Sequence, residues 1–214
     1  MTIAVLGGTG KEGRGLALCW ARAGRSVLLG SRSDARGREA ADELNAKLGS
    51  SNVTGMSNRA AANEADIVVS TLPDQSHIEI LSELTDELSG KILVTATIAW
   101  PPGPTSEPSA AELVQSALGD SVRVVAAFQT VSAGTLAKSD SSHTEDVLIC
   151  SDDLDAAEQT RALVHDTGLR GVIAGNLSNT RVCEVITGLL LKINRHYGVK
   201  STGIRITGIG EQLP

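Results

Sequence analysis

The sequence predicts an α/β protein, a Rossmann-like, doubly wound parallel sheet with a small C-terminal α/β lobe. Short aliphatic strands alternate with helical patterns along the chain, and a glycine-rich turn joins the first strand to the first helix. Residues 66–72 form an apolar run without alternation, which is typical of a parallel strand buried on both faces. At 214 residues, the chain can hold one sizeable core and a small appended lobe.

The first part of the chain predicts strand, turn, helix, strand and helix. Residues 2–6 are β-branched and aliphatic, and residues 11–23 carry an Ala- and Leu-rich helical pattern. A second aliphatic strand follows at 26–29. The charged helix expected over 35–48 ends at Gly49, because glycine readily adopts the left-handed conformation found after many helices.

The same alternation continues through the middle of the chain. Pro73 closes the buried apolar run, because proline cannot donate to a strand ladder. The expected strands are 52–56, 66–72, 91–98 and 122–127, and the expected helices are 59–65, 76–88 and 110–118.

A proline-rich loop is expected over residues 99–108, which hold four of the six prolines together with Trp100 and Gly103. Such a segment cannot join a strand ladder. Ligands of open α/β sheets bind beyond the carboxyl ends of the strands, and this loop directly follows a strand. The stretch 100–104 therefore either borders the site or is a plain connector.

The pattern changes after Ala133. A polar loop over 138–144 comes first. The elements expected after it are strands 147–150 and 172–173 and helices 154–167 and 176–197. Apolar residues of the last helix repeat at helical spacing, and this stripe fits a subunit interface as well as an intrachain core. Its members are Val182, Val185, Ile186, Leu189, Leu190 and Ile193.

Composition excludes several classes of protein. The net charge of −6 and the aromatic content of 2% argue against nucleic-acid binding and against anionic membranes as partners. No apolar run reaches the roughly 20 residues of a membrane span. The three cysteines lack a CxxC spacing, and the four histidines are scattered, so we expect no metal site. We therefore expect a cytoplasmic protein.

The turn after the first strand has the form G-x-G-x-x-G and opens a predicted helix. Gly8 is expected to permit the tight turn, Gly10 to let the backbone approach a pyrophosphate, and Gly13 to let helix and sheet pack closely. The amino terminus of the helix attracts the anion. The alternative is a glycine turn that serves packing only. The predicted dinucleotide-binding residues of the turn are Gly8, Thr9, Gly10, Lys11, Glu12 and Gly13.

The end of the second strand predicts which dinucleotide binds. A carboxylate there accepts hydrogen bonds from the ribose of NAD and repels a 2′-phosphate. This chain instead has Ser31 and Arg32, a hydroxyl and a guanidinium that suit a phosphate dianion, so we expect NADP. Thr9 can add a hydroxyl contact. Arg36 is a further candidate, although it also fits a solvated helix charge.

A second binding segment is expected where the buried strand ends. Thr71, Leu72 and Pro73 can flank the adenine-side ribose or the nicotinamide, unless this is an ordinary strand end. These sites predict an NADP-binding Rossmann domain over residues 1–150. Residues 151–214 would form the small lobe, which contributes to a second-substrate cleft and is a candidate for the dimer interface.

Four stretches, 3–17, 30–32, 124–128 and 175–181, together resemble the family of F420-dependent NADP oxidoreductases over nearly the whole chain. The double glycine, the Gly-Ser-Arg strand tip and the late Leu-Ser-Asn-x-Arg sequence are more particular than the glycine turn alone. The resemblance implies a homodimer and hydride transfer between C5 of the deazaflavin F420 and C4 of the nicotinamide. Both reactive carbons belong to cofactors, so the reaction needs positioning more than a strong acid or base.

One position departs from the family pattern. The family often carries a histidine where this chain has Gln129, next to the expected deazaflavin site. Glutamine donates and accepts hydrogen bonds, but it does not change charge near neutral pH. We expect Gln129 and Thr130 to lie near the hydride-transfer site, with no side chain assigned as a certain catalytic group.

Two other functions fit the same residues. The protein could use NADPH to reduce another acceptor, such as a flavin, an imine or a carbonyl, in a pocket near Gln129 and Trp100. It could also be a catalytically silent NADP(H)-sensing module. Turnover of a second small molecule distinguishes the enzymes from the sensor.

Overall fold

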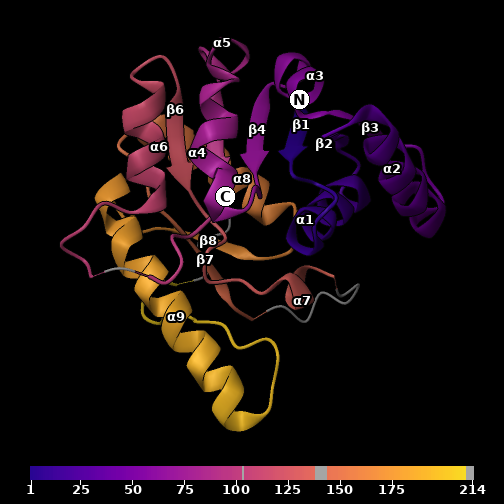
Figure 1. Ribbon diagram of the computed structural model, residues 1–214. Coiled ribbons are helices and arrows are strands. Elements are labelled where there is room, and N and C mark those ends of the chain that lie inside the picture. Colours follow the sequence, from indigo (N-terminus) through magenta and orange to yellow (C-terminus); the bar gives the residue numbers. More distant parts are fainter. Residues whose placement is uncertain (103, 138–143, 211–214) are drawn as a thin grey trace.

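The computed structural model describes residues 1–102, 104–137 and 144–210 and has the predicted doubly wound architecture (Figure 1). Its main sheet has six parallel strands in the order β3-β2-β1-β4-β5-β6. The strands are β1 (Thr2–Leu6), β2 (Ser26–Ser31), β3 (Val53–Ser57), β4 (Ile67–Ser70), β5 (Ile92–Thr95) and β6 (Arg123–Ala126). The order reverses between β1 and β4, and ligand crevices of open α/β sheets lie at this reversal.

Helices cover both faces of the sheet, because alternate residues of β1 point into two separate cores. Ile3 and Val5 pack in one core, and Ala4 and Leu6 pack in the other; all four are fully buried. The first core contains α1 (Lys11–Arg22), α2 (Asp34–Leu48) and α8 (Leu154–His165). The second contains α3 (Asn58–Glu64), α4 (Asp74–Ser82), α5 (Thr85–Leu88) and α6 (Ala110–Leu118).

The single helix predicted over 76–88 is wrong, because α4 ends at Ser82 and α5 begins at Thr85. Leu84, which is buried, adopts φ −109° and ψ 14° between the two helices. The carbonyl of Glu83 accepts a hydrogen bond from Arg59. A tertiary partner and a buried side chain therefore interrupt a pattern that is continuous in the sequence.

The strand predicted over 91–98 is also too long. β5 ends at Thr95, because its neighbour β4 ends at Ser70 and Ala96 N makes the last hydrogen bond to Ser70 O. The chain then turns away, and Thr97 Oγ1 donates to Leu72 O at 2.8 Å. The shortened strand leaves these backbone groups at the edge of the sheet where ligands bind.

The C-terminal lobe is a β-α-β unit. β7 (Asp146–Ile149) and β8 (Arg170–Ile173) are parallel and are joined through α8. Cys150 forms an antiparallel bridge with Ala126, which attaches the lobe to β6. The boundary at residue 150 stays a proposal, since β7 and β8 pair across it. The helix α7 (Ala133–Leu136) was not predicted, and residues 138–143 of the predicted polar loop lie outside the described residues.

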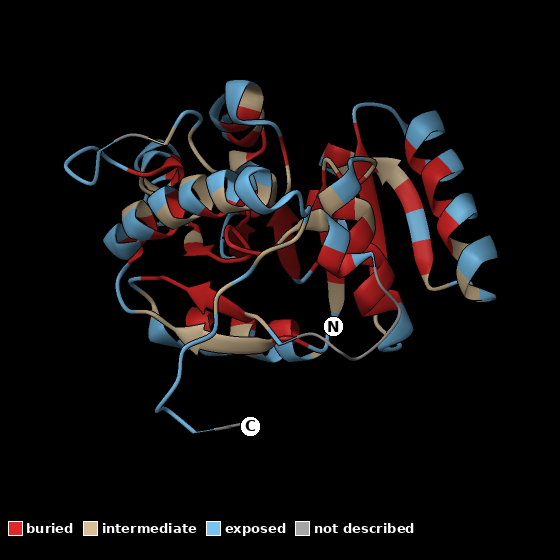
Figure 2. Ribbon diagram, turned by 90° about the horizontal axis from the view of Figure 1, so that it is seen from below, coloured by how far each residue is buried: buried red, intermediate tan, exposed pale blue. Residues whose placement is uncertain are grey.

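The last helix, α9 (Thr180–Tyr197), extends away from the sheet and follows a short 3₁₀ turn (Figure 1). Most of its length is exposed or half-buried (Figure 2). The predicted apolar stripe has buried and exposed members: Leu190 is buried, whereas Val182 and Leu189 are 50% and 55% exposed. Among the described residues, no helix has both the length and the apolar character that a membrane crossing requires.

Candidate functional site

The glycine turn between β1 and α1 is held by backbone hydrogen bonds and close packing. Gly8 N donates to Gly30 O at 2.9 Å, and Gly10 N donates to Gly7 O at 3.0 Å. Gly8 was expected to permit the tight turn, but the residue in the left-handed conformation is Gly7, with φ 69°. Gly8 is required for space, since a Cβ there would lie 2.6 Å from Leu29 Cδ1.

The other two glycines of the motif have different environments. A Cβ on Gly13 would lie 2.6 Å from Gly8 Cα and 2.7 Å from Thr71 Oγ1, so α1 packs directly on the turn. A Cβ on Gly10 would meet only Gly7 O, at 3.4 Å. The open side of Gly10 adjoins the first turn of α1, whose N–H groups lack helical partners. This turn therefore has both the space and the donors that a pyrophosphate requires.

Asn58, which is not part of the glycine turn, holds that turn in place with its side chain. Its Oδ1 accepts a hydrogen bond from Gly7 N at 3.2 Å and would lie 2.7 Å from a Cβ on Gly30. The side chain is buried and comes from the first residue of α3. Ser57, the preceding residue, caps α3 by accepting from Ala60 N. The end of β3 thus joins β1 and β2 in forming the site.

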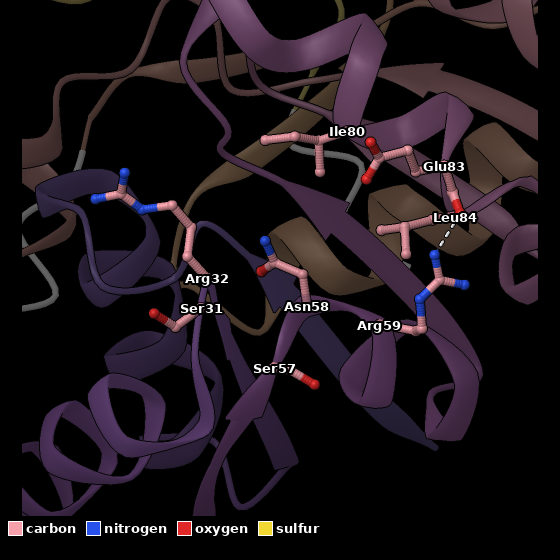
Figure 3. A pocket seen from close by; sticks show the side chains of 8 residues that line it. All are labelled: Ser31, Arg32, Ser57, Asn58, Arg59, Ile80, Glu83 and Leu84. Atoms are coloured by element: carbon pink, nitrogen blue, oxygen red, sulfur yellow. Dashed lines mark hydrogen bonds between the residues drawn. The ribbon is translucent and has the colours of Figure 1, made fainter.

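A pocket of about 250 Å³ lies at the tip of β2 (Figure 3). Ser31 ends β2 and is buried, whereas Arg32 is exposed. Two guanidinium groups and two hydroxyls border the pocket, a combination that fits a phosphate dianion, and two aliphatic side chains can contact a base. The lining residues are Ser31, Arg32, Ser57, Asn58, Arg59, Ile80, Glu83 and Leu84.

The two arginines of this pocket differ in how far their charge is neutralised. Arg59 donates to Glu83 O at 2.8 Å, the bond drawn in Figure 3, and it pairs with Glu87. Arg32 has no ion pair among the described residues. Arg36 lies on α2 and does not line the pocket. Arg32 is therefore the cation most available to a ligand here.

The segment after β4 lies against the glycine turn. Thr71 Oγ1 donates to Leu6 O at 3.0 Å, which holds the end of β4 beside the end of β1. Leu72 is buried, and its Cδ2 would lie 3.2 Å from a Cβ on Gly7. Pro73 follows as the N-cap residue of α4. All three residues thus lie at the crevice, while their contact with a cofactor stays a prediction.

Gln129 and Thr130 lie just after β6 and are both buried. Gln129 Nε2 donates to Thr95 O at 2.9 Å, and Thr187 Oγ1 of α9 donates to Gln129 O at 2.8 Å. The Thr130 hydroxyl has no hydrogen-bond partner among the described residues. A buried hydroxyl without a partner costs free energy, so a ligand group that bonds to Thr130 would remove that cost.

Phe128 holds this segment in an unusual backbone conformation, with φ 74°. Its ring packs edge-to-face on Trp20, with centroids 6.1 Å apart. Positive φ is strained for a phenylalanine and persists only where packing determines it. The buried aromatic pair therefore sets the direction in which Gln129 and Thr130 leave β6.

The proline-rich loop lies against the start of α4, while its contact with a ligand stays a prediction. Trp100 N donates to Asp74 Oδ2 at 3.2 Å, which places the loop beside the first turn of α4. Glu184 of α9 is buried, and its carboxylate accepts hydrogen bonds from Ala110 N, at 2.9 Å, and from Ala99 N. Burial raises the pKa of Glu184 to about 7. Glu184 thus connects α9 to both ends of the loop.

Two further titratable groups lie near the crevice. Burial raises the pKa of Glu12, in the first turn of α1, to about 8. Burial also lowers the pKa of His77 to about 4, so this imidazole is neutral near pH 7, 3.3 Å from Thr95 Oγ1. Within the described part of the chain, no three His, Cys, Asp or Glu side chains gather as metal ligands would.

Sequence reasoning missed Asn58, Arg59, Glu184 and Thr187. The first two follow the third strand directly, so their position at the carboxyl end of that strand was a usable signal. Glu184 and Thr187 are polar residues three apart, which places both on one side of α9. The apolar stripe is the stronger pattern in the sequence of that helix, and this polar pair interrupts it only at two positions.

Comparisons with known proteins agree with the geometry. The family described as NADP oxidoreductase coenzyme F420-dependent matches residues 2–98. A relative from Methanocaldococcus jannaschii, named F420-dependent NADP reductase, is 35% identical over 98% of this chain and 99% of its own length. A relative of the same name from Methanothermobacter thermautotrophicus is 37% identical over 99% of this chain and 97% of its own.

A crystal structure of a protein from Arthrobacter sp. FB24 has a TM-score of 0.81 and 23% identity, covering 96% of this chain and 99% of that one. This likeness shows the fold. The two sequence relatives extend over the lobe as well as the sheet and so show the family. This chain belongs to the F420-dependent NADP oxidoreductases.

Proposed function

We propose that this protein transfers a hydride between NADP(H) and the deazaflavin coenzyme F420. The observation that carries the NADP part is exposed Arg32, which has no ion pair within the described part of the chain, beside buried Ser31 at the tip of β2, one strand away from the open turn at Gly10. The relatives' name, F420-dependent NADP reductase, supports F420 as the second substrate.

When bound, NADP(H) and F420 supply the hydride donor and acceptor. The chain supplies binding and orientation. The α1 amino terminus would hold the pyrophosphate, and Ser31 and Arg32 would hold the 2′-phosphate. The unpartnered Thr130 hydroxyl would bond to a polar group of a bound ring, while buried Leu72 would exclude water beside it.

An absorbance assay tests the proposal. Purified protein is mixed with reduced F420 and either NADP or NAD, and in parallel NADPH is offered free flavin as acceptor. We expect reoxidation of F420 by NADP, slower reoxidation by NAD and no turnover of flavin. Tight NADPH binding without F420 turnover would contradict the proposal and favour another acceptor or a sensor.

Gln129 gives a pH prediction for the same reaction. Substitution Gln129→His introduces an imidazole at a buried position, where desolvation lowers its pKa below the usual value of about 6.5, as it does for His77, whereas glutamine stays neutral. We therefore expect the variant-to-wild-type ratio of hydride-transfer rates to change as the pH falls below about 6.5. Single-turnover stopped-flow absorbance measures this ratio. Gln129→Met, which is neutral, should give a ratio that is lower than one but constant with pH; a constant ratio for Gln129→His would contradict the prediction.

Glu12 gives a pH prediction for cofactor binding. Below its pKa of about 8 the carboxyl is neutral, and above it the carboxylate repels the pyrophosphate. NADPH binding should therefore weaken as the pH rises through 8, by at most about tenfold per pH unit. In Glu12→Gln this loss should disappear while affinity near neutral pH is kept. Fluorescence titration of NADPH measures both proteins; equal weakening of the two would refute the role of Glu12.

We also propose a homodimer that acts in the cytoplasm. Its support is one side of the α9 stripe, where Val182 is exposed and Ile186 and Ile193 are half-buried, since a row of large apolar side chains on a helix surface marks protein interfaces. These three residues follow at spacings of four and seven residues, so they share one side of α9. A cytoplasmic location keeps the free thiols reduced.

A further inference from the structure

A cavity of about 940 Å³ lies between the proline-rich loop and one side of α9. The loop contributes Trp100, which is 58% exposed, and three prolines, and α9 contributes Val185 and Leu191 among its apolar residues. Lys192 and Arg195 line the same cavity. The cavity is therefore apolar on its walls and carries two positive charges from a single helix.

The cavity adjoins the expected hydride-transfer site. Gly188 of α9 is so close to the loop that a Cβ there would lie 3.3 Å from Pro102 Cγ. The preceding residue, Thr187, donates to Gln129 O at 2.8 Å. On the loop side, Trp100 N is bonded to Asp74 at the start of α4. Consecutive residues of α9 thus face the cavity, at Gly188, and the segment after β6, at Thr187.

The charge of the cavity has one sign. Its lining residues, all within the described part of the chain, include no Asp or Glu. The helix dipole favours a cation at Arg195, which lies in the last turn of α9, whatever that residue binds. Lys192 precedes the last turn of α9, so the helix dipole does not explain why a second cation lies beside Arg195. Two cations three residues apart at an apolar cavity suit an elongated anion.

We propose that this cavity binds the anionic tail of F420, with Lys192 and Arg195 as counter-charges to its phosphodiester and glutamate carboxylates. The inference rests on the proposed function and extends it to a second binding region for the same substrate. The deazaflavin ring would lie toward Gln129 and Thr130, and the tail would run outward between Trp100 and α9. The free flavins lack this phosphodiester-linked chain of carboxylates, so the two cations would also select F420 against them.

A second copy of the chain is a less suitable occupant. A symmetric contact centred on the cavity would bring Lys192 and Arg195 of both copies into one interface, with no acidic lining residue to neutralise them. Two members of the apolar stripe, Val185 and Leu189, line the cavity, whereas Val182, Ile186 and Ile193 lie on a neighbouring side of α9. A dimer can use that neighbouring side and leave the cavity open.

Binding of two deazaflavins in the absence of NADP(H) tests the inference without turnover. Fluorescence anisotropy measures the Kd of oxidised F420 and of the tail-less deazaflavin, which keeps only the ribityl chain. The variants Lys192→Met and Arg195→Met remove charge but keep apolar bulk, and Lys192→Arg should restore binding. Lys200→Met, at an exposed lysine that does not line the cavity, is the control.

We expect each Met variant to raise the Kd of F420 about tenfold, which corresponds to ~1.4 kcal/mol, and the effect should shrink as salt increases. The Kd of the tail-less deazaflavin and the behaviour of Lys200→Met should not change. The inference would be overturned if the Met variants bound both deazaflavins equally more weakly, or if they bound both as wild type does. It would also be overturned if light scattering showed that the Met variants change protomer association while their affinity for F420 stays the same. If wild type reduces neither deazaflavin with NADPH yet binds F420 through its tail, the proposed function fails and the cavity assignment stands.

Discussion

Replacing Arg32 with alanine is expected to raise the Kd of NADPH about 10- to 100-fold and to leave the Kd of NADH unchanged within about twofold. Arg32 lies at the tip of β2 beside Ser31, and it has no ion pair among the described residues. A charge-assisted hydrogen bond to a phosphate contributes about 1.5–3 kcal/mol, and NADH has no 2′-phosphate to receive it. Because Arg32 is exposed, the loss should be smaller at high salt.

Arg59→Ala is the matched control for this prediction. Arg59 lines the same pocket, but its guanidinium is already bonded to Glu83 O and Glu87. Its removal should weaken NADPH binding less than the removal of Arg32, and it should lower the melting temperature because the two acceptors lose their partner. Isothermal titration with both dinucleotides decides the question. Equal loss of NADPH and NADH in Arg32→Ala would show that Arg32 does not bind the 2′-phosphate.

Local sequence determined most of the sheet. The alternation of short aliphatic strands with helices predicted all six strands of the main sheet in order, because the central strands β1, β4 and β5 are buried on both faces and are therefore apolar along most of their length. The errors occurred where a distant partner decides the outcome. Arg59 holds the carbonyl at which the predicted helix 76–88 breaks, and the end of β4 determines where β5 ends.

The candidate site divides in the same way. The glycine turn and the tip of β2 are each a short contiguous stretch, so their binding residues can be predicted from the sequence. The family resemblance based on them is confirmed. Glu184 and Thr187 are different, because each acts on a segment more than fifty residues away, at Ala110 and Gln129. Such long-range contacts have no local pattern, so only the folded chain shows that α9 supports the loop and the end of β6.

Alanine substitutions at Gly10 and Gly13 are expected to separate cofactor binding from folding. A Cβ on Gly10 meets only Gly7 O, at 3.4 Å, and otherwise enters open space at the amino terminus of α1. We expect Gly10→Ala to lower the free energy of unfolding by about 1 kcal/mol or less, since Gly10 is the N-cap residue, yet to raise the Kd of NADPH at least about 100-fold by blocking the approach of the pyrophosphate.

A Cβ on Gly13 instead meets Gly8 Cα at 2.6 Å and Thr71 Oγ1 at 2.7 Å, so it must displace α1 from the turn. We expect Gly13→Ala to lower the free energy of unfolding by about 1–3 kcal/mol, the range for an overpacked core, and to weaken NADPH binding as well. Urea denaturation without ligand, followed by NADPH titration, measures both quantities for both variants. If Gly10→Ala bound NADPH as wild type does, the space beside Gly10 would not hold the pyrophosphate, and the turn would serve packing alone. The two variants together therefore distinguish a glycine required for the helix contact within the chain from one required by the ligand, because only the latter loses affinity while the fold stays intact.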